Sequence, residues 1–163
     1  MDGQIRYSDL GFTLVEVLFS LLLTGILLVV SLQLFLDQWG TSRVCKDKME
    51  AHYAAVTAGR LVSDAIREAE SVQWANKNGK WTLTVNPSRE ADSDHYYLED
   101  KNNDGVKDFY RVHKGIDNPV VSGIVDWNCD QGESGLWTIS FQGQIRKQNV
   151  FWQGKIRVRD TVN

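Results

Sequence analysis

Residues 12–36 read FTLVEVLFSLLLTGILLVVSLQLFL, and this stretch decides how the rest of the sequence is interpreted. It carries a single charge, Glu16, and the residues from Val17 to Leu36 are all uncharged. A helix of twenty residues is about 30 Å long, which matches the hydrocarbon thickness of a bilayer. The stretch contains no proline. We predict a transmembrane helix here, because a buried core helix this apolar needs a far larger domain around it.

A removable signal peptide is the first alternative to a permanent anchor. Such peptides have an apolar stretch of about 7–15 residues, followed by small residues at a cleavage site. Here the apolar run is longer, and Asp37, Gln38 and Trp39 follow it. We therefore expect the segment to remain in the protein.

Residues 10–16 read LGFTLVE and form a motif at the start of the apolar run. A short polar segment ends in Gly11, an aromatic residue follows at Phe12, and a carboxylate follows at Glu16. The motif closely resembles the N-terminal signal of type IV prepilins and type II secretion pseudopilins. The resemblance implies that a prepilin peptidase cleaves between Gly11 and Phe12 and methylates the new N-terminus of Phe12.

The same resemblance implies three segments. Residues 1–11 are the leader peptide, residues 12–36 are the transmembrane and assembly helix, and residues 37–163 are the globular pilin domain. It also implies a structural subunit that polymerises with other pilins or pseudopilins through the N-terminal helices.

Glu16 is the charged residue of the apolar run. A carboxylate inside a membrane helix costs about 2.5–3.5 kcal/mol on insertion scales, so we expect it to be paired or functional. Phe12 lies four residues earlier, on the same helical face. In the family that the motif resembles, this Glu meets the free N-terminal amine of a neighbouring subunit, which implies an assembly role for Glu16. A tolerated charge near the membrane interface is the alternative.

The charges that flank the apolar run point to the opposite topology. The leader has one basic residue, Arg6, whereas Arg43, Lys46 and Lys48 follow the run. Counting Lys and Arg places the C-terminal side in the cytoplasm. We give the motif more weight, since a large domain translocates despite a weak bias. The expectation is a single-pass protein of the cytoplasmic (inner) membrane, with its C-terminal domain outside the cytoplasm and incorporated in a pilus or pseudopilus.

The sequence after Leu36 predicts a continued helix and then strands. Apolar residues recur at three- and four-residue steps, and no proline interrupts them. One helix is therefore predicted from about Phe12 to about Trp74, ended by the Asn-Lys-Asn-Gly sequence at residues 76–79. The apolar residues predicted to line its buried face are Cys45, Met49, Tyr53, Val56, Leu61, Val62, Ile66, Ala69 and Val72.

Segments rich in aromatic and β-branched residues follow from Lys80 and predict strands. They cover residues 80–85, 95–99, 106–113, 120–129, 136–142 and 149–159. The predicted fold class is α+β and pilin-like, with a long N-terminal transmembrane spine helix packed on a C-terminal antiparallel β-sheet domain. The tryptophans expected to supply much of the core are Trp81, Trp127, Trp137 and Trp152. Looser matches, such as Ala58-Gly59-Arg60-Leu61, resemble J-type pseudopilins and PilW-type minor pilins.

Residues 100–108 read DKNNDGVKD, which fits the first half of an EF-hand calcium loop, D-x-N-x-D-G. Arg111 occupies the twelfth position, where the bidentate Glu of an EF-hand stands, so the segment is not an EF-hand. A β-hairpin loop, in which Asn and Asp favour the turn, is the other interpretation. The candidate ligands of a structural Ca²⁺ are the side chains of Asp100, Asn102, Asp104 and Asp108 and the carbonyl of Val106.

Cys45 and Cys129 are the two thiols of the chain. On the exported side of a membrane a disulfide between them would tie the spine helix to the sheet. Two free buried thiols fit the sequence as well, because the sequence does not show the distance between them.

A basic stretch near the C-terminus surrounds Phe151 and Trp152. It fits a contact with DNA or an acidic partner, but the solvated outer face of the last strand is the interpretation we prefer. Its members are Arg146, Lys147, Lys155, Arg157 and Arg159.

Enzyme signatures are missing from the sequence. His52, His95 and His113 show no metal-ligand spacing, and no P-loop or dinucleotide fingerprint is present. The net charge of −3 gives no general case for nucleic-acid binding. We therefore expect a minor pilin or pseudopilin that requires no cofactor, whose partners are a prepilin peptidase, other pilins and the membrane. The alternative is a membrane-anchored extracytoplasmic domain that binds calcium or a ligand and never polymerises.

Overall fold

The structure, a computed structural model, describes residues 13–86 and 93–158. The chain divides into two compact units, residues 1–43 and residues 44–163. The helix α1, Leu14–Glu68, supplies the described part of the first unit and continues into the second. By length and composition α1 is apolar enough to cross a membrane, and its most apolar window is fully exposed. These features agree with the predicted anchor.

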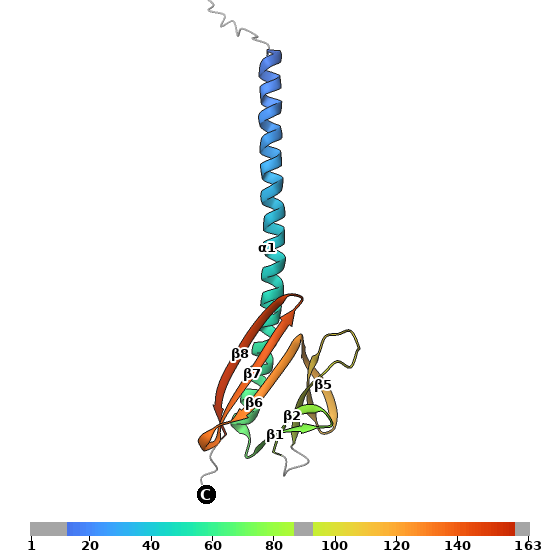
Figure 1. The fold of residues 1–163 in the computed structure, drawn as a ribbon, viewed down its shortest axis with the longest axis vertical. Coiled ribbons are helices and arrows are strands. Elements are labelled where there is room, and N and C mark those ends of the chain that lie inside the picture. Colours follow the sequence, from blue (N-terminus) through green and yellow to red (C-terminus); the bar gives the residue numbers. More distant parts are fainter. Residues whose placement is uncertain (1–12, 87–92, 159–163) are drawn as a thin grey trace, which may run out of the picture. The chain divides into compact units, whose positions relative to one another are not determined.

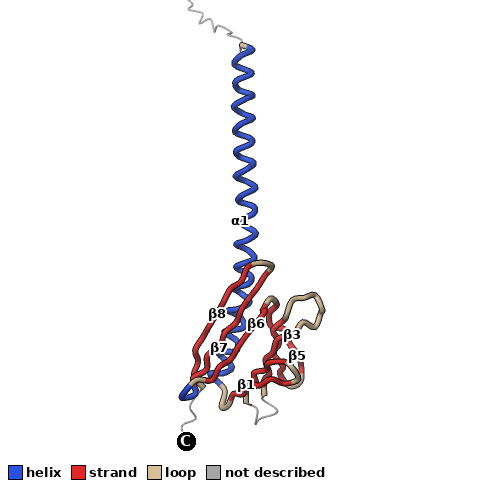
Figure 2. The backbone as a smooth tube through the Cα atoms, viewed as in Figure 1, coloured by secondary structure: helices blue, strands red, loops and turns tan. Residues whose placement is uncertain are grey.

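The second unit combines the C-terminal part of α1 with two antiparallel sheets (Figures 1 and 2). One sheet has five strands in the order β1-β2-β3-β4-β5, and the other has three in the order β6-β7-β8. The α+β fold class with antiparallel sheets is therefore confirmed. The strands are β1 (Val72–Lys77), β2 (Lys80–Val85), β3 (Asp94–Glu99), β4 (Asp108–His113), β5 (Ile116–Ser122), β6 (Ile124–Gln131), β7 (Leu136–Ile145) and β8 (Gln148–Arg157), with a 3-10 turn, η2, at Glu133–Gly135.

The predicted end of the helix near Trp74 is wrong. The helix ends at Glu68, and β1 begins at Val72. The Asn-Gly sequence forms the turn between β1 and β2, with positive φ angles of 54° at Asn78 and 81° at Gly79. Such a two-residue turn matches the twist of a β-hairpin, so this signal belongs to a hairpin and not to a helix terminus.

The predicted strand at residues 120–129 is two strands. Gly123, with φ of 85°, separates β5 from β6, and the two strands belong to different sheets. The backbone N–H of Gly123 donates to Lys107 O, and its carbonyl accepts from Gln144 N. This corner divides the strands between two sheets, where the sequence predicted one.

The core lies where the C-terminal part of α1 packs on the sheets, and the smallest helix residues line it. Ala51, Ala54, Ala55 and Ala58 are each at most 2% exposed. A Cβ atom on Gly143 of β7 would lie 2.3 Å from the carbonyl oxygen of Ala51, so α1 and β7 approach too closely for larger side chains.

Three residues of the predicted buried stripe, Cys45, Met49 and Tyr53, face solvent instead. Met49 is 67% exposed and Tyr53 is 70% exposed. They lie on the side of α1 away from the closely packed alanine face.

Aromatic residues fill the rest of the core, as the sequence predicted in part. Trp127 and Trp137 are buried, and Trp152 packs half-buried against the core. The expectation for Trp81 is wrong, because it is 51% exposed and stacks on Trp74 with ring centroids 5.2 Å apart.

Candidate functional site

The start of α1 is the segment that the sequence motif singles out. Gly11 and Phe12 lie outside the described residues, and Glu16 lies in the first turn of the helix. Glu16 Oε2 accepts hydrogen bonds from Thr13 N and from Thr13 Oγ1, each 2.9 Å long. Glu16 N donates in return to Thr13 Oγ1 at 3.3 Å. Thr13 and Glu16 thus form a capping box, which satisfies N–H groups that a helix leaves unpaired at its start.

The sequence pattern Thr-x-x-Glu at residues 13–16 is typical of a capping box. This signal is separate from the assembly role that we expect for Glu16. The Glu16 carboxylate therefore accepts hydrogen bonds from its own chain.

Polar side chains inside the apolar run are also satisfied within the helix. Ser20 Oγ donates to the carbonyl of Val17 at 2.9 Å, and Thr24 Oγ1 donates to the carbonyl of Ser20 at 2.7 Å. Such back-bonding to the preceding turn removes the need for water, which the interior of a bilayer does not provide.

Residues 6–32 match the family described as the prokaryotic N-terminal methylation motif. The chain carries a pilin-type N-terminal signal. The match covers Gly11, Phe12, Glu16 and most of the apolar run, and it indicates a type IV pilin-like or pseudopilin-like precursor. Proteins of this kind are structural, and the motif with the apolar helix fits a protein anchored by a single membrane span. No curated protein and no solved structure matches the chain.

The segment proposed for calcium connects β3 to β4, and its carboxylates bind the loop itself. Asp100 Oδ2 accepts from Gly105 N at 2.9 Å, and Asp104 Oδ1 accepts from Val106 N at 2.8 Å. Asp108 is buried at the start of β4, where its Oδ2 accepts from the hydroxyl of Tyr110 at 3.4 Å. Across residues 13–86 and 93–158, no three His, Cys, Asp or Glu side chains are grouped to hold a metal ion. Calcium binding stays a prediction.

The two cysteines are free, so the disulfide expected as one alternative is not formed. Cys45 is exposed on α1, and Cys129 is buried on β6, opposite Ile139 of β7. The close contact between Ala51 of α1 and Gly143 of β7 gives a reference point for the distance between the two cysteines. About 9 Å of helix separates Cys45 from Ala51, and about 13 Å of strand separates Gly143 from Ile139 in the other direction. Bonded cysteines have Cα atoms within about 7 Å, so the two thiols are too far apart.

The basic residues near the C-terminus do not form one surface. Arg146 lies in the turn between β7 and β8 and reaches Asp47 of α1, with Nη1 3.1 Å from both carboxylate oxygens. Lys155 and Arg157 are exposed on β8. Arg159 lies outside the described residues. Arg146 is thus paired with a carboxylate of α1, and a contact of the basic residues with DNA or an acidic partner stays a prediction.

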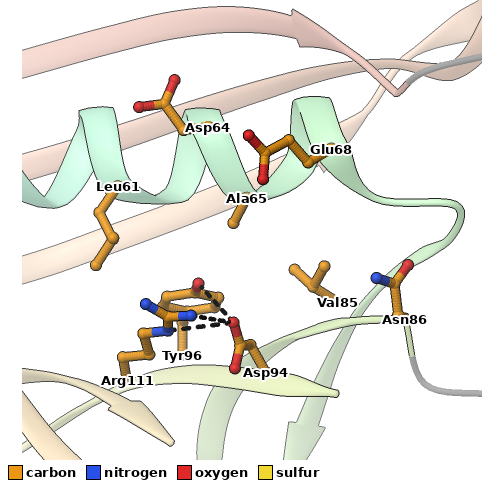
Figure 3. A pocket seen from close by; sticks show the side chains of 9 residues that line it. All are labelled: Leu61, Asp64, Ala65, Glu68, Val85, Asn86, Asp94, Tyr96 and Arg111. Atoms are coloured by element: carbon orange, nitrogen blue, oxygen red, sulfur yellow. Dashed lines mark hydrogen bonds and ion pairs between the residues drawn. The ribbon is translucent and has the colours of Figure 1, made fainter. Parts of the chain in front are cut away.

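A hollow of about 330 Å³ lies between α1 and the five-stranded sheet, where an ion-pair cluster forms its floor (Figure 3). Leu61 and Ala65 of α1 point toward Arg111 of β4 and toward Asp94 and Tyr96 of β3. Arg111 Nη2 and Nε donate to Asp94 Oδ2 at 2.8 and 3.1 Å.

His113 completes this cluster, with Nδ1 2.7 Å from Asp94 Oδ1. Burial raises the pKa of Asp94, but the hydrogen bonds from His113 and Arg111 outweigh it, so the pKa is lowered overall. The cluster depends on the β3–β4 register, in which Asp94 lies opposite His113 and Tyr96 lies opposite Arg111. The cluster cannot be recognised from the sequence, because no local pattern brings these residues together.

Proposed function

We propose that this protein is a minor pilin or pseudopilin. Prepilin peptidase removes residues 1–11 and methylates Phe12, and the globular domain then lies outside the cytoplasm. The observation that supports the proposal best is the coincidence of two features: the methylation motif at residues 6–32 and an apolar helix that begins at Leu14 with Glu16 in its first turn.

In the proposed filament, subunits associate through their N-terminal helices. Glu16 of one subunit meets the methylated amine of Phe12 in a neighbour, which neutralises two charges that are costly inside a membrane. The capping box holds the Glu16 carboxylate at the N-terminal end of α1, where the helix dipole also favours a negative charge. In the proposed filament, the methylated amine of a neighbouring Phe12 approaches this carboxylate.

Two substitutions separate the assembly role of Glu16 from its role in the capping box. Glu16→Gln keeps an acceptor for Thr13 N and Thr13 Oγ1, since Gln forms capping boxes as Glu does, but it removes the negative charge. Glu16→Ala removes both. Pairing with an amine requires the charge, so we expect both variants to lose co-purification with the other pilins of the system.

The experiment compares these variants in cells that contain the prepilin peptidase and the other pilins. Ser20→Ala is the matched control, because Ser20 is polar, lies four residues later and bonds only to Val17 O within the described contacts. The control should assemble as the natural protein does. If Glu16→Gln co-purifies normally, the charge of Glu16 is not needed for assembly and the residue acts only as a helix cap. That result would favour an anchored domain that never polymerises.

The proposed position is the filament tip, where a minor subunit helps to initiate assembly. Type IV pili, type II secretion pseudopili and competence pseudopili all use such subunits, and the J-type and PilW-type subclasses fit the loose matches in the helix. The chain provides no assembly energy, so ATP-driven insertion belongs to other proteins of the system. The genes beside this one distinguish the three systems.

A further inference from the structure

The outer face of the five-stranded sheet carries a hollow of about 330 Å³ that the pilin interpretation does not use. The hairpin of β1 and β2 forms one side of it, and β3 and β4 form the floor. The lining includes Lys77 and Lys80 beside the turn, with Thr82, His95 and Tyr97 beneath them.

Two lysines lie directly opposite each other at this site. Lys77 pairs with Lys80 across β1 and β2, so both side chains lie on the same sheet face. Like charges at directly opposed positions destabilise a hairpin. Lys80 Nζ pairs with Glu99 Oε1. Lys77 Nζ has a neutral hydrogen-bond partner, Thr84 Oγ1 at 3.4 Å, in the part of the chain that the structure describes.

A hydrogen-bond chain connects this ammonium group to His95. Thr84 Oγ1 accepts from Lys77 and lies 3.1 Å from His95 Nδ1, so the hydroxyl joins the two groups. A neutral His95 with its proton on Nε2 offers one N–H as a donor, and a protonated His95 offers both ring N–H groups. Burial lowers the pKa of His95, the charge of Lys77 lowers it further, and Asp94 opposes them.

The described side chains that line the hollow carry a net positive charge. Among residues 13–86 and 93–158, Lys80 pairs with the carboxylate of Glu99, whereas Lys77 pairs with no carboxylate. Tyr97 adds a flat aromatic wall, and the ring centroid lies 5.7 Å from Lys80 Nζ. An anion in this hollow would meet the positive charge of the two lysines that line it and an N–H of His95.

We propose that this hollow is an oxyanion site, which holds the phosphate, sulfate or carboxylate group of a ligand between Lys77, Lys80 and His95. The attached part of the ligand lies against the ring of Tyr97. Nothing in this proposal requires the protein to polymerise, so it stands apart from the assembly role of Glu16.

The test is a pH titration of the histidine ring signals by NMR, on the full chain in detergent micelles. Sodium sulfate is compared with sodium chloride at equal ionic strength, and sodium acetate forms a third arm. An anion that binds the protonated ring tenfold more tightly than the neutral ring raises its pKa by one unit at saturation. We expect sulfate or acetate to raise the pKa of His95, while His52 and His113 report the general effect of salt. The larger of the two responses assigns the site to a tetrahedral oxyanion or to a carboxylate.

Two lysine variants locate the response. Lys77→Met should abolish the anion-dependent shift, and in chloride it should raise the pKa of His95, because a charge that lowers it has been removed. Lys155→Met is the matched control, since Lys155 is exposed on β8 of the other sheet, and it should keep the shift. The proposal is wrong if His95 titrates identically in all three salts, or if Lys77→Met responds as the natural protein does.

Discussion

Gly59 of α1 packs against the indole of Trp152 on β8, and Gly59→Ala tests this helix–sheet contact. A Cβ atom at residue 59 would lie 2.4 Å from Cε3 and Cζ3 of the indole, well inside van der Waals contact. The ring also packs against Gly154, where a Cβ would lie 2.7 Å from Trp152 Cη2, so it has little room to retreat. Overpacking of this kind costs about 1–3 kcal/mol.

The helix propensity of alanine works in the other direction. Replacing glycine by alanine inside a helix stabilises it by about 1 kcal/mol, so the expected net loss for Gly59→Ala is about 0–2 kcal/mol. Gly40→Ala is the matched control, because Gly40 lies in the same helix and no atom lies within 4 Å of its Cβ position. That variant should be as stable as the natural protein or slightly more stable.

Urea unfolding of the full chain in detergent, followed by tryptophan fluorescence, measures both variants. With a slope of about 2 kcal/mol per molar urea, the midpoint of Gly59→Ala should fall by up to about 1 M and lie below that of Gly40→Ala. Trp152→Leu should remove most of the extra cost, so that the double variant loses less than the sum of the single losses. Equal midpoints for Gly59→Ala and Gly40→Ala would show that the indole does not lie against this face of α1.

Three further predictions concern the globular domain. Gly143→Ala should destabilise it by about 3 kcal/mol, because the atom in the way is the backbone carbonyl oxygen of Ala51; an unchanged thermal midpoint would contradict the close approach of α1 and β7. Hydrogen bonds lower the pKa of Asp94, so its contribution to stability is present above its unfolded pKa, near 4, and is lost as the pH falls through the lower folded pKa. Asp94→Asn should therefore flatten the acid limb of stability against pH, and an acid limb as steep as before would show that another group titrates. If the loop at residues 100–108 binds calcium, Ca²⁺ should raise the melting temperature relative to EGTA, and Asp104→Ala should abolish the rise. Equal melting temperatures in Ca²⁺ and in EGTA would rule out calcium binding by this loop.

The sequence predicted the parts of the molecule that are encoded locally. The apolar run at residues 12–36 and the motif around Gly11 are continuous in the chain, so length and residue order suffice to recognise them. The Asn78-Gly79 signal is equally local, but it predicted the end of a helix where the structure has a hairpin turn. The residues before it, Val72 to Trp74, continue the helical spacing of the apolar positions, while their β-branched and aromatic character favours a strand.

The rest depends on contacts between segments far apart in the chain. Alanines line the buried face of α1 because Gly143 brings β7 close to the helix, and this distance is not visible from the periodicity that predicted Met49 and Tyr53 inside. The corner at Gly123 divides β5 from β6. It is held by backbone hydrogen bonds to Lys107, which precedes β4, and to Gln144 in β7. The cluster around Asp94 likewise required the register of two paired strands.

The N-terminus of the protein recovered from membranes tests the central claim most directly. Intact mass and N-terminal sequencing, in cells with a prepilin peptidase and in matched cells without it, show whether the chain is processed. The account predicts a chain that starts at N-methylated Phe12 in the first cells and at Met1 in the second. An uncleaved Met1 terminus in both would contradict it, and would support the topology that Arg43, Lys46 and Lys48 indicate.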